Sequence, residues 1–278
     1  MCWPNRAAPQ AIPLHHALAL GALQGPTELL PVSSSAHLTL LPWLLRWNWT
    51  GIDAEQRKTF EVAVHAGAAP AVPIVLRDKL SGQPAASRSD SFAELGLSLA
   101  PSVVVGYVFE RRIERQLRNP WAVAVGLLAG GLALAWADRS SGTRHRDEAG
   151  RRDAAWLGLA QACALFPGVS RGGATLAAAR IRGFARADAH RLSRELALPV
   201  IVGAAVLKGA RLRARRLRPE ARAPFLVGAV AAFLSTLASK RLLVVSDGDR
   251  PLWPYAAYRV ALAAAIFRSE RTLHPSRR

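Results

Sequence analysis

Apolar stretches that carry almost no charge recur along this sequence and restrict its fold more than any other feature. Five of them run for 16 to 18 residues: Thr59–Leu76, Phe92–Phe109, Pro120–Ala137, Ala223–Ser239 and Leu252–Phe267. A helix needs about 20 apolar residues to cross the ~30 Å hydrocarbon core of a bilayer. A single such stretch is also typical of a buried helix in a soluble protein, but five in one chain favour an integral membrane protein. We therefore expect an all-α fold, a polytopic helical bundle.

The charged residues lie mostly in the gaps between these stretches. The chain has 37 lysines and arginines against 19 acidic residues, a formal net charge of +18. Arginines concentrate in Glu110–Asn119, Asp138–Asp153 and Arg211–Arg222. Basic loops beside apolar helices fit the anionic head groups of membrane lipids. No nucleic-acid motif and no interleaved aromatic residues accompany them, so we expect membrane lipids and no nucleic acid as partners.

A first polar motif lies inside an apolar frame between Ala17 and Leu45. Its polar members are Gln24, Thr27, Glu28, Ser33, Ser34, Ser35 and His37. Ionisable side chains are costly at membrane depth, so they predict a functional cavity. Pro26 and Pro31 interrupt any helix here, which predicts a re-entrant segment instead of a full crossing. The alternative is a serine-rich turn between two helices of a soluble protein.

A second motif again places a proline and small polar residues among apolar ones. After the break at Pro167-Gly168 it contains Ser170, Arg171, Gly172, Gly173 and Thr175. Glycines expose backbone N–H groups, and an arginine offers a bidentate fork, so together they favour a phosphate-binding cradle. The spacing differs from that of a Walker A loop. The alternative is an ordinary loop arginine.

The two motifs look like copies of each other. Leu20-Gly21 and Gln24 match Leu157-Gly158 and Gln161 at one constant offset. Pro31, Ser34 and Thr39 match Pro167, Ser170 and Thr175 at an offset shorter by one, which one deleted residue explains. Repeated broken-helix units are typical of membrane proteins whose site lies between the repeats. We predict one membrane domain (residues 1–278) with repeats at about 11–137 and 154–267, and with both motifs facing one cavity.

Several segments of the chain resemble a known family. QGPTELLPVSSSAHL (Gln24–Leu38) resembles the signature [EQ]GLTEFLPVSSSGHL, and PGVSRGGAT (Pro167–Thr175) resembles PG-x-SRSGAT. These signatures belong to the undecaprenyl-diphosphate phosphatases of the bacitracin-resistance type. KTFEVAVHAGA (Lys58–Ala68) and PYAAYRV (Pro254–Val260) agree as well, so the resemblance covers nearly the whole chain.

The resemblance implies an enzyme that hydrolyses undecaprenyl diphosphate to undecaprenyl phosphate and inorganic phosphate. This reaction recycles the lipid carrier of cell-wall synthesis and gives bacitracin resistance. The family implies a multi-pass protein of the bacterial inner membrane, with an internal inverted repeat, two re-entrant broken-helix segments and an active site toward the periplasm. Its implied partners are the polyprenyl diphosphate and membrane lipids. A homodimer is one possible oligomeric state, which the sequence does not fix. A transporter or lipid flippase on the same scaffold, without hydrolysis, is the alternative.

The resemblance also implies roles for single residues. The implied catalytic residues are Glu28, Ser34, His37 and Arg171, and the implied phosphate-binding residues are Ser33, Ser170, Gly172, Gly173 and Thr175. Gln24 and Glu28 would bind a divalent cation, Mg²⁺ or Ca²⁺, because both ions require oxygen ligands. The nucleophile is Ser34, His37 or a water molecule, and the residues alone do not decide between them.

The chain departs from the family pattern at four places. Ala36 and Gly172 replace a glycine and a serine of the two signatures, and His65 replaces a usual glutamine. Arg194 and Glu195 place two charges at the start of a presumed membrane helix, in a run that is apolar in the family. We expect Ala36 to narrow the cavity and Gly172 to remove a phosphate donor. The charged pair would snorkel or pair with neighbours near the membrane surface, and the alternative is a degraded or specialised copy of the family.

Overall fold

The computed structural model describes residues 11–49, 51–80, 88–117, 119–213, 219–246 and 248–273, and their regular structure is helical. The first half contains α1 (Leu14–Leu29), α2 (Ser34–Leu44), α3 (Ala54–Ala68), α4 (Ala71–Leu80), α5 (Arg88–Gln116) and α6 (Pro120–Ala137). A short 3₁₀ turn, η1 (Arg146–Glu148), precedes the second half. That half contains α7 (Arg151–Cys163), α8 (Arg171–Ile181), α9 (Arg186–Arg213), α10 (Pro219–Ala238), α11 (Lys240–Ser246) and α12 (Trp253–Leu273). Residues 214–218, part of the arginine-rich stretch predicted to face lipid, lie outside the described residues.

Three helical segments are long and apolar enough to cross a membrane. They are Ala54–Arg77, which runs through α3 and α4, Pro120–Ala137 (α6) and Pro219–Ala238 (α10). Each coincides with a stretch expected from the sequence. The start of α6 is fixed locally, because Pro120 needs no amide partner and the Asn119 side chain accepts from the Ala122 N–H at 2.8 Å. The prediction of an all-α membrane protein is confirmed.

Helix α9 was not among the five charge-poor stretches, since charged residues interrupt its apolar pattern, and only the family resemblance led us to presume a membrane helix there. It nevertheless runs for 28 residues, about 42 Å, which is enough to cross a bilayer. Its Glu195 carboxylate accepts from Arg146 at 3.1 Å and pairs with Arg191 one turn earlier. The family departure at Glu195 is therefore compensated by partners in the preceding loop and in α9 itself.

Two pairs of short helices, α1 with α2 and α7 with α8, enter the molecule without crossing it. Helices α2 and α8 each have 11 residues, about 16 Å, which is half of the hydrocarbon thickness. Each begins after a serine in the left-handed region, Ser33 with φ 76° and Ser170 with φ 67°. Such backbone strain in a non-glycine residue is typical of functional loops. These are the breaks that Pro31 and Pro167 predicted. Pro26 lies inside α1, so the prediction that it interrupts the helix is wrong.

The two halves of the chain correspond at a single offset, the one that relates Gln24 to Gln161. Helices α1 and α7 begin at this offset, and helices α2 and α8 both begin and end at it. The strained serines Ser33 and Ser170 have the same separation. The deletion inferred from the sequence, which paired Ser34 with Ser170, is therefore wrong, and Ser34 corresponds to Arg171. Matching residue types led to the wrong pairing. Each helix begins directly after its strained serine, so Ser33 and Ser170 are the equivalent residues.

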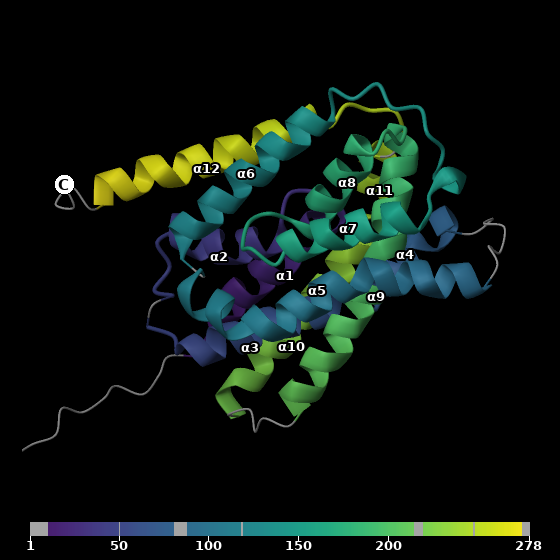
Figure 1. Cartoon of the computed structure of the whole chain (residues 1–278). Helices are drawn as coiled ribbons and strands as arrows, with labels where there is room; N and C mark the ends of the chain where they lie inside the picture. The colour runs from purple at the N-terminus through teal and green to yellow at the C-terminus, as the bar shows by residue number, and fades with distance from the viewer. Residues whose placement is uncertain are drawn as a thin grey trace, which may run out of the picture.

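The halves pack by exchanging elements. Helix α1 lies along α10, and α7 lies along α5. The Gly25 N–H donates to Ser235 Oγ on α10 at 2.9 Å, and Gln161 Nε2 donates to the Ser98 carbonyl on α5 at 2.9 Å. Helices α6 and α12 pack together beside these short central helices (Figure 1). Contacts between helices of opposite halves therefore hold the two halves together.

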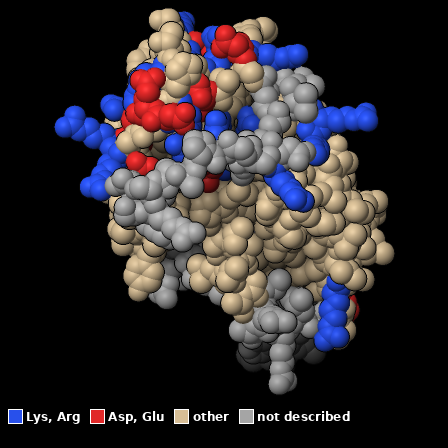
Figure 2. Space-filling view, turned by 90° about the vertical axis from the view of Figure 1, so that its right-hand side faces the viewer, with Lys and Arg blue, Asp and Glu red and all other residues tan. Residues whose placement is uncertain are grey.

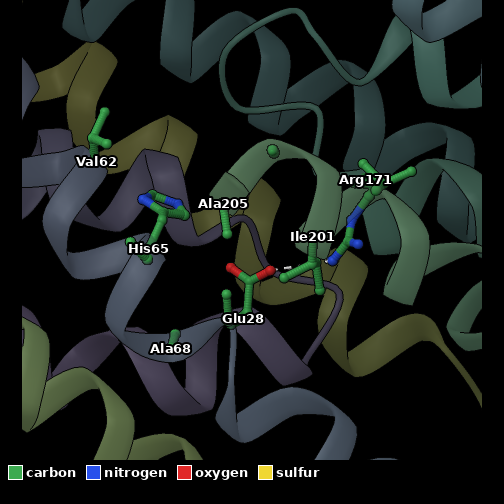
Figure 3. Close-up of a pocket in the computed structure, with 11 residues that line it drawn as sticks. Glu28, Val62, His65, Ala68, Arg171, Ile201 and Ala205 are labelled. Carbon is green, nitrogen blue, oxygen red and sulfur yellow. Dashed lines mark hydrogen bonds and ion pairs between the residues drawn. The ribbon is translucent and has the colours of Figure 1, made fainter. Parts of the chain in front are cut away.

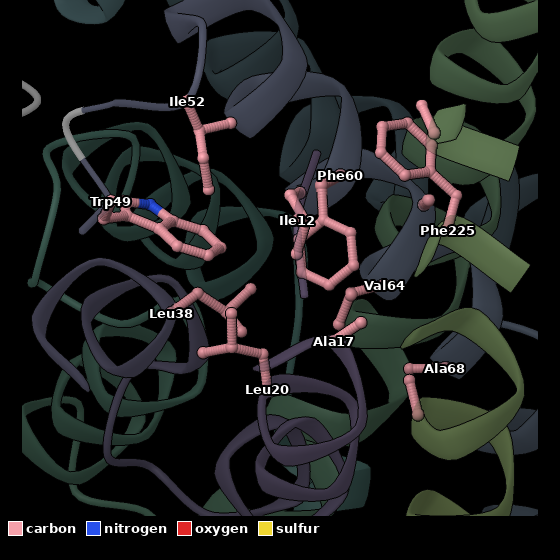
Figure 4. Packing of buried hydrophobic residues seen from close by; sticks show 13 residues of the cluster. Ile12, Ala17, Leu20, Leu38, Trp49, Ile52, Phe60, Val64, Ala68 and Phe225 are labelled. Atoms are coloured by element: carbon pink, nitrogen blue, oxygen red, sulfur yellow. The ribbon is translucent and has the colours of Figure 1, made fainter. Parts of the chain in front are cut away.

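The interior is built from small and branched side chains, and the outside is apolar over a wide area. Ile12, Leu20, Phe60, Val64 and Phe225 form part of one buried cluster that joins α1, α3 and α10 (Figure 4). Figure 2 shows most charged side chains at one end, a smaller basic group at the opposite end, and a broad surface between them that is largely without charge. Large apolar side chains that are exposed include Val103, Val104, Tyr107, Leu226, Val230 and Leu234. A surface of this kind is suited to lipid.

Candidate active site

The carboxylate of Glu28 joins three elements in one hydrogen-bonded cluster. Its Oε2 accepts from Ser34 Oγ at 2.8 Å and from Gln24 Nε2 at 3.0 Å. Its Oε1 accepts from Arg171 Nη2 at 3.2 Å. Glu28 and Gln24 come from α1, Ser34 begins α2 and Arg171 begins α8. The two motifs therefore meet at one site, as their similarity predicted.

A cavity of about 160 Å³ opens beside this cluster. Its polar lining comes from Glu28, His65 and Arg171 (Figure 3). The other walls are aliphatic and come from α3, the α3–α4 connection and α9: Val62, Ala66, Ala68, Ala69, Val200, Ile201, Ala204 and Ala205. One charged end and apolar walls suit an anionic head group carried on an apolar chain.

Arg171 is held between the two halves of the molecule. Its Nη1 donates to the Ala197 carbonyl on α9 at 2.9 Å, while its Nη2 contacts Glu28. Its side chain remains 21% exposed. A guanidinium has five N–H donors in a planar fork. Arg171 can therefore keep its protein contacts and still offer donors to an anion in the cavity.

The strained backbone at Ser33 determines where Ser34 points. Ser33 is buried and precedes the first turn of α2, and its Oγ lies 3.4 Å from Ser35 Oγ. Ser34 Oγ consequently faces Glu28 across the gap between α1 and α2. A hydroxyl that donates to a carboxylate is arranged for deprotonation by that carboxylate.

His37 is engaged elsewhere. Its Nδ1 lies 2.7 Å from the Ser33 carbonyl and its Nε2 lies 2.6 Å from the Tyr258 hydroxyl. Because a carbonyl only accepts, Nδ1 carries the proton and Nε2 accepts from Tyr258. Both ring nitrogens thus have partners other than Ser34. Sequence reasoning did not single out Tyr258, although it lies in the segment PYAAYRV that resembles the family.

The predicted phosphate-binding residues divide into two groups. Ser170 Oγ accepts from the Gly173 N–H at 3.2 Å and so caps α8. Thr175 is buried, with its Oγ1 donating to the Arg171 carbonyl at 3.0 Å and lying 2.6 Å from Ser193 Oγ. Both residues fix the start of α8. Gly172 differs, because a Cβ built there meets only the Pro31 Cα at 4.0 Å.

Gln24 and Glu28 supply oxygen atoms of the kind that a divalent cation requires. Gln24 is fully buried, and its Oε1 has no hydrogen-bond partner. With Glu28 it supplies two kinds of oxygen ligand. In the described part of the chain, no group of three His, Cys, Asp or Glu side chains could hold a metal alone. Mg²⁺ commonly uses one or two carboxylates and completes its coordination with waters and substrate phosphates, so this donor set is sufficient in chemical type.

Of two family departures, His65 and Ala36, only the first lies at the site. His65 lines the cavity, and its Nδ1 donates to the Glu61 carbonyl at 2.8 Å. Ala36 lies instead in a buried cluster with Leu40 and Val123. The expectation that its methyl group narrows the cavity is therefore wrong, since residue 36 points into the α2–α6 packing.

Comparison with known proteins adds independent information. Residues 17–265 match the family described as Bacitracin resistance protein BacA. The undecaprenyl-diphosphatase of Geobacter metallireducens is 38% identical over 90% of this chain and 96% of its own length. That of Moorella thermoacetica is 38% identical over 90% of this chain and 95% of its own. That of Desulforudis audaxviator is 42% identical over 69% and 74% of the two chains.

Proposed function

The chain belongs to the bacitracin resistance protein BacA family, and we propose that it hydrolyses undecaprenyl diphosphate to undecaprenyl phosphate and inorganic phosphate. The observation that carries this function is the Glu28–Ser34–Arg171 cluster at the polar end of an apolar-walled cavity. The charged head group would lie against Arg171, and the first part of the prenyl chain would lie between α3 and α9.

Ser34 is the nucleophile in this proposal. Glu28 Oε2 takes the proton of Ser34 Oγ as the oxygen attacks the terminal phosphorus. The bond between that phosphorus and the bridging oxygen breaks, and prenyl phosphate leaves. Glu28 passes its proton to solvent and then accepts one from a water, which attacks the phosphoserine and releases inorganic phosphate. Arg171 donates to the phosphoryl oxygens, on which negative charge is concentrated throughout.

The remaining residues position these groups. Ser170, Gly173 and Thr175 fix the first turn of α8, from which Arg171 projects. The backbone N–H groups at the starts of α2 and α8 favour an anion between them. His37 holds the Ser33 carbonyl and thereby the strained residue before Ser34. Gln24 and Glu28 would hold Mg²⁺ or Ca²⁺, which neutralises part of the negative charge of the diphosphate when bound.

The family and the apolar surface support a location in a membrane. In this proposal that membrane is the bacterial inner membrane, the cavity opens toward the periplasm, and lipids cover the exposed apolar side chains. A homodimer is a separate proposal. Its test is the mass of the purified protein in detergent.

Phosphate release from a polyprenyl diphosphate by the purified protein tests the function. The assay uses Mg²⁺, Ca²⁺ or a chelator, and compares wild type with Ser34→Ala and Arg171→Ala. Ser35→Ala is the matched control, because its exposed side chain lies next to Ser34 without contacting Glu28. We expect cation-dependent release that Ser34→Ala and Arg171→Ala lower by a factor of 100 or more and that Ser35→Ala preserves.

Two outcomes would contradict the proposal. Unchanged release by Ser34→Ala would exclude Ser34 as the nucleophile. Movement of the lipid between leaflets of a vesicle, with no phosphate released, would favour a flippase instead.

A further inference from the structure

Arg259 on α12 is a fully buried cation in the middle of the molecule, with none of its surface exposed. Its Nη2 donates to the carbonyls of Gly168 at 3.1 Å and Val169 at 2.6 Å, and its Nη1 lies 3.5 Å from the Pro31 carbonyl. Pro31 belongs to the loop between α1 and α2. Gly168 and Val169 belong to the loop between α7 and α8. One side chain therefore ties together the two broken segments that form the site.

The surroundings are shaped to this guanidinium. A Cβ at Gly130 on α6 would lie 2.1 Å from Arg259 Nη2. A Cβ at Gly173 on α8 would lie 2.4 Å from its Nη1. Both distances are far shorter than van der Waals contact, so any larger residue at either position would displace the guanidinium. The space is filled by Arg259 because two helices contribute glycines there.

The charge of Arg259 has no acidic partner among the described residues. Arg171, Arg182 and Arg186 each form an ion pair with a carboxylate. Arg259 has only carbonyl acceptors, and its Nε has no hydrogen-bond partner. A buried charge without a counter-ion is costly. Because Arg259 contacts both loops that lead into α2 and α8, an anion bound where these loops meet would supply compensating charge.

We propose that Arg259 is a positioning residue for the phosphate-transfer site and adds to its attraction for a diphosphate. This inference rests on the proposed function. By holding the Pro31 and Val169 carbonyls, Arg259 keeps the starts of α2 and α8 together. Ser34 and Arg171 then reach the same carboxylate of Glu28. Without it the loops separate, and a displacement of about 1 Å between reacting groups lowers a rate about 100-fold.

Arg180 offers a matched control. It is also buried, at 2% exposed, donates to the carbonyls of Phe184 and Ser140, and has an unpartnered Nε. It lies near the opposite end of α8 from Arg171. If Arg259 only stabilised the fold, substitution of either arginine would have the same kind of effect.

The experiment measures kcat, KM and the thermal midpoint for Arg259→Ala, Arg259→Lys and Arg180→Ala in detergent. We expect Arg259→Ala to lower kcat about 100-fold in the folded fraction and Arg259→Lys about tenfold. Guanidinium ion at tens of millimolar should restore part of the activity of Arg259→Ala by entering the vacated space. Arg180→Ala should lower the thermal midpoint while the folded fraction keeps its kcat, with no effect of guanidinium.

A wild-type kcat in folded Arg259→Ala, or no restoration by guanidinium, would overturn the proposal. Should Arg259→Ala not fold, Arg259→Lys decides, and an unchanged kcat there would overturn it equally. Methylenediphosphonate supplies a readout that needs no turnover. It should raise the thermal midpoint of wild type but not of Arg259→Lys. Absence of phosphate release with this shift present would refute only the proposed function, whereas an equal shift in both proteins would refute the role of Arg259.

Discussion

Ser34 and His37 lie one helical turn apart on α2, yet their side chains contact different parts of the molecule. Ser34 donates to Glu28 at 2.8 Å, while His37 bridges the Ser33 carbonyl and the Tyr258 hydroxyl. The sequence left three nucleophiles open because residues three apart on a helix share a face. The hydrogen bonds favour Ser34, with Glu28 as its base. The deciding partner, Tyr258, comes from α12 near the other end of the chain, which no local pattern could connect with the motif.

Gly172 allows a prediction about phosphate affinity. The family signature PG-x-SRSGAT has a serine at this position. A Cβ at residue 172 meets nothing closer than 4.0 Å. We expect Gly172→Ser to lower KM three- to tenfold at nearly unchanged kcat, the effect of one added hydrogen bond of about 1 kcal/mol. Steady-state kinetics on a polyprenyl diphosphate measures it. Gly172→Ala is the control, because it fills the same space without a hydroxyl. A fall in KM equal to that of the serine variant would show that the hydroxyl is irrelevant.

Among the helices, the re-entrant pairs were predictable from local sequence, whereas α9 was presumed only from the family resemblance. Pro31 and Pro167 forced breaks that the sequence shows directly. The hydropathy pattern alone misses α9, because Arg194 and Glu195 interrupt its apolar run. The partner that makes Glu195 tolerable, Arg146, is 49 residues away in the chain. Local hydropathy measures the cost of such a charge but not the contact that offsets it.

The loop that contains Arg146 also anchors the start of α7. Its Arg144 forms an ion pair with Asp153, whose side chain is 5% exposed. Burial by itself raises the pKa of Asp153. Hydrogen bonds from Arg144, Arg182 and the Gly150 N–H outweigh that effect and hold the pKa below its ordinary value. Folding therefore favours the ionised carboxylate. Its stabilisation is fully present above the ordinary pKa of about 4 and is lost as the pH falls through the lower folded value.

We therefore expect Asp153→Asn to lower stability by about 1–3 kcal/mol near pH 7. We also expect the gap between the two thermal midpoints to close as the pH is lowered from 5 toward 2. Thermal unfolding in detergent at several pH values measures both. Asp249→Asn is the control, since Asp249 is 87% exposed and its contact with Arg186 is 3.8 Å long. A gap that stays constant with pH would mean that the ionisation of Asp153 does not stabilise the fold.

At the scale of the whole molecule, close approach of helices from opposite halves holds the two re-entrant pairs in place. Substitution of the glycines at these contacts tests this role. A Cβ at Gly25 on α1 would lie 2.2 Å from Ser235 Oγ, and one at Gly158 on α7 would lie 2.6 Å from the Leu97 carbonyl. A Cβ at Gly203 on α9 meets nothing within 4 Å.

Alanine favours a helix by about 1 kcal/mol over glycine, whereas overpacking costs about 1–3 kcal/mol. Gly203→Ala should therefore raise the thermal midpoint, while Gly25→Ala and Gly158→Ala should lower it. The last two should also lower kcat, because α1 positions Glu28 and α7 leads into the loop before Arg171. If all three substitutions changed the midpoint in the same direction, the exchange of elements between the halves would not be what holds the site together.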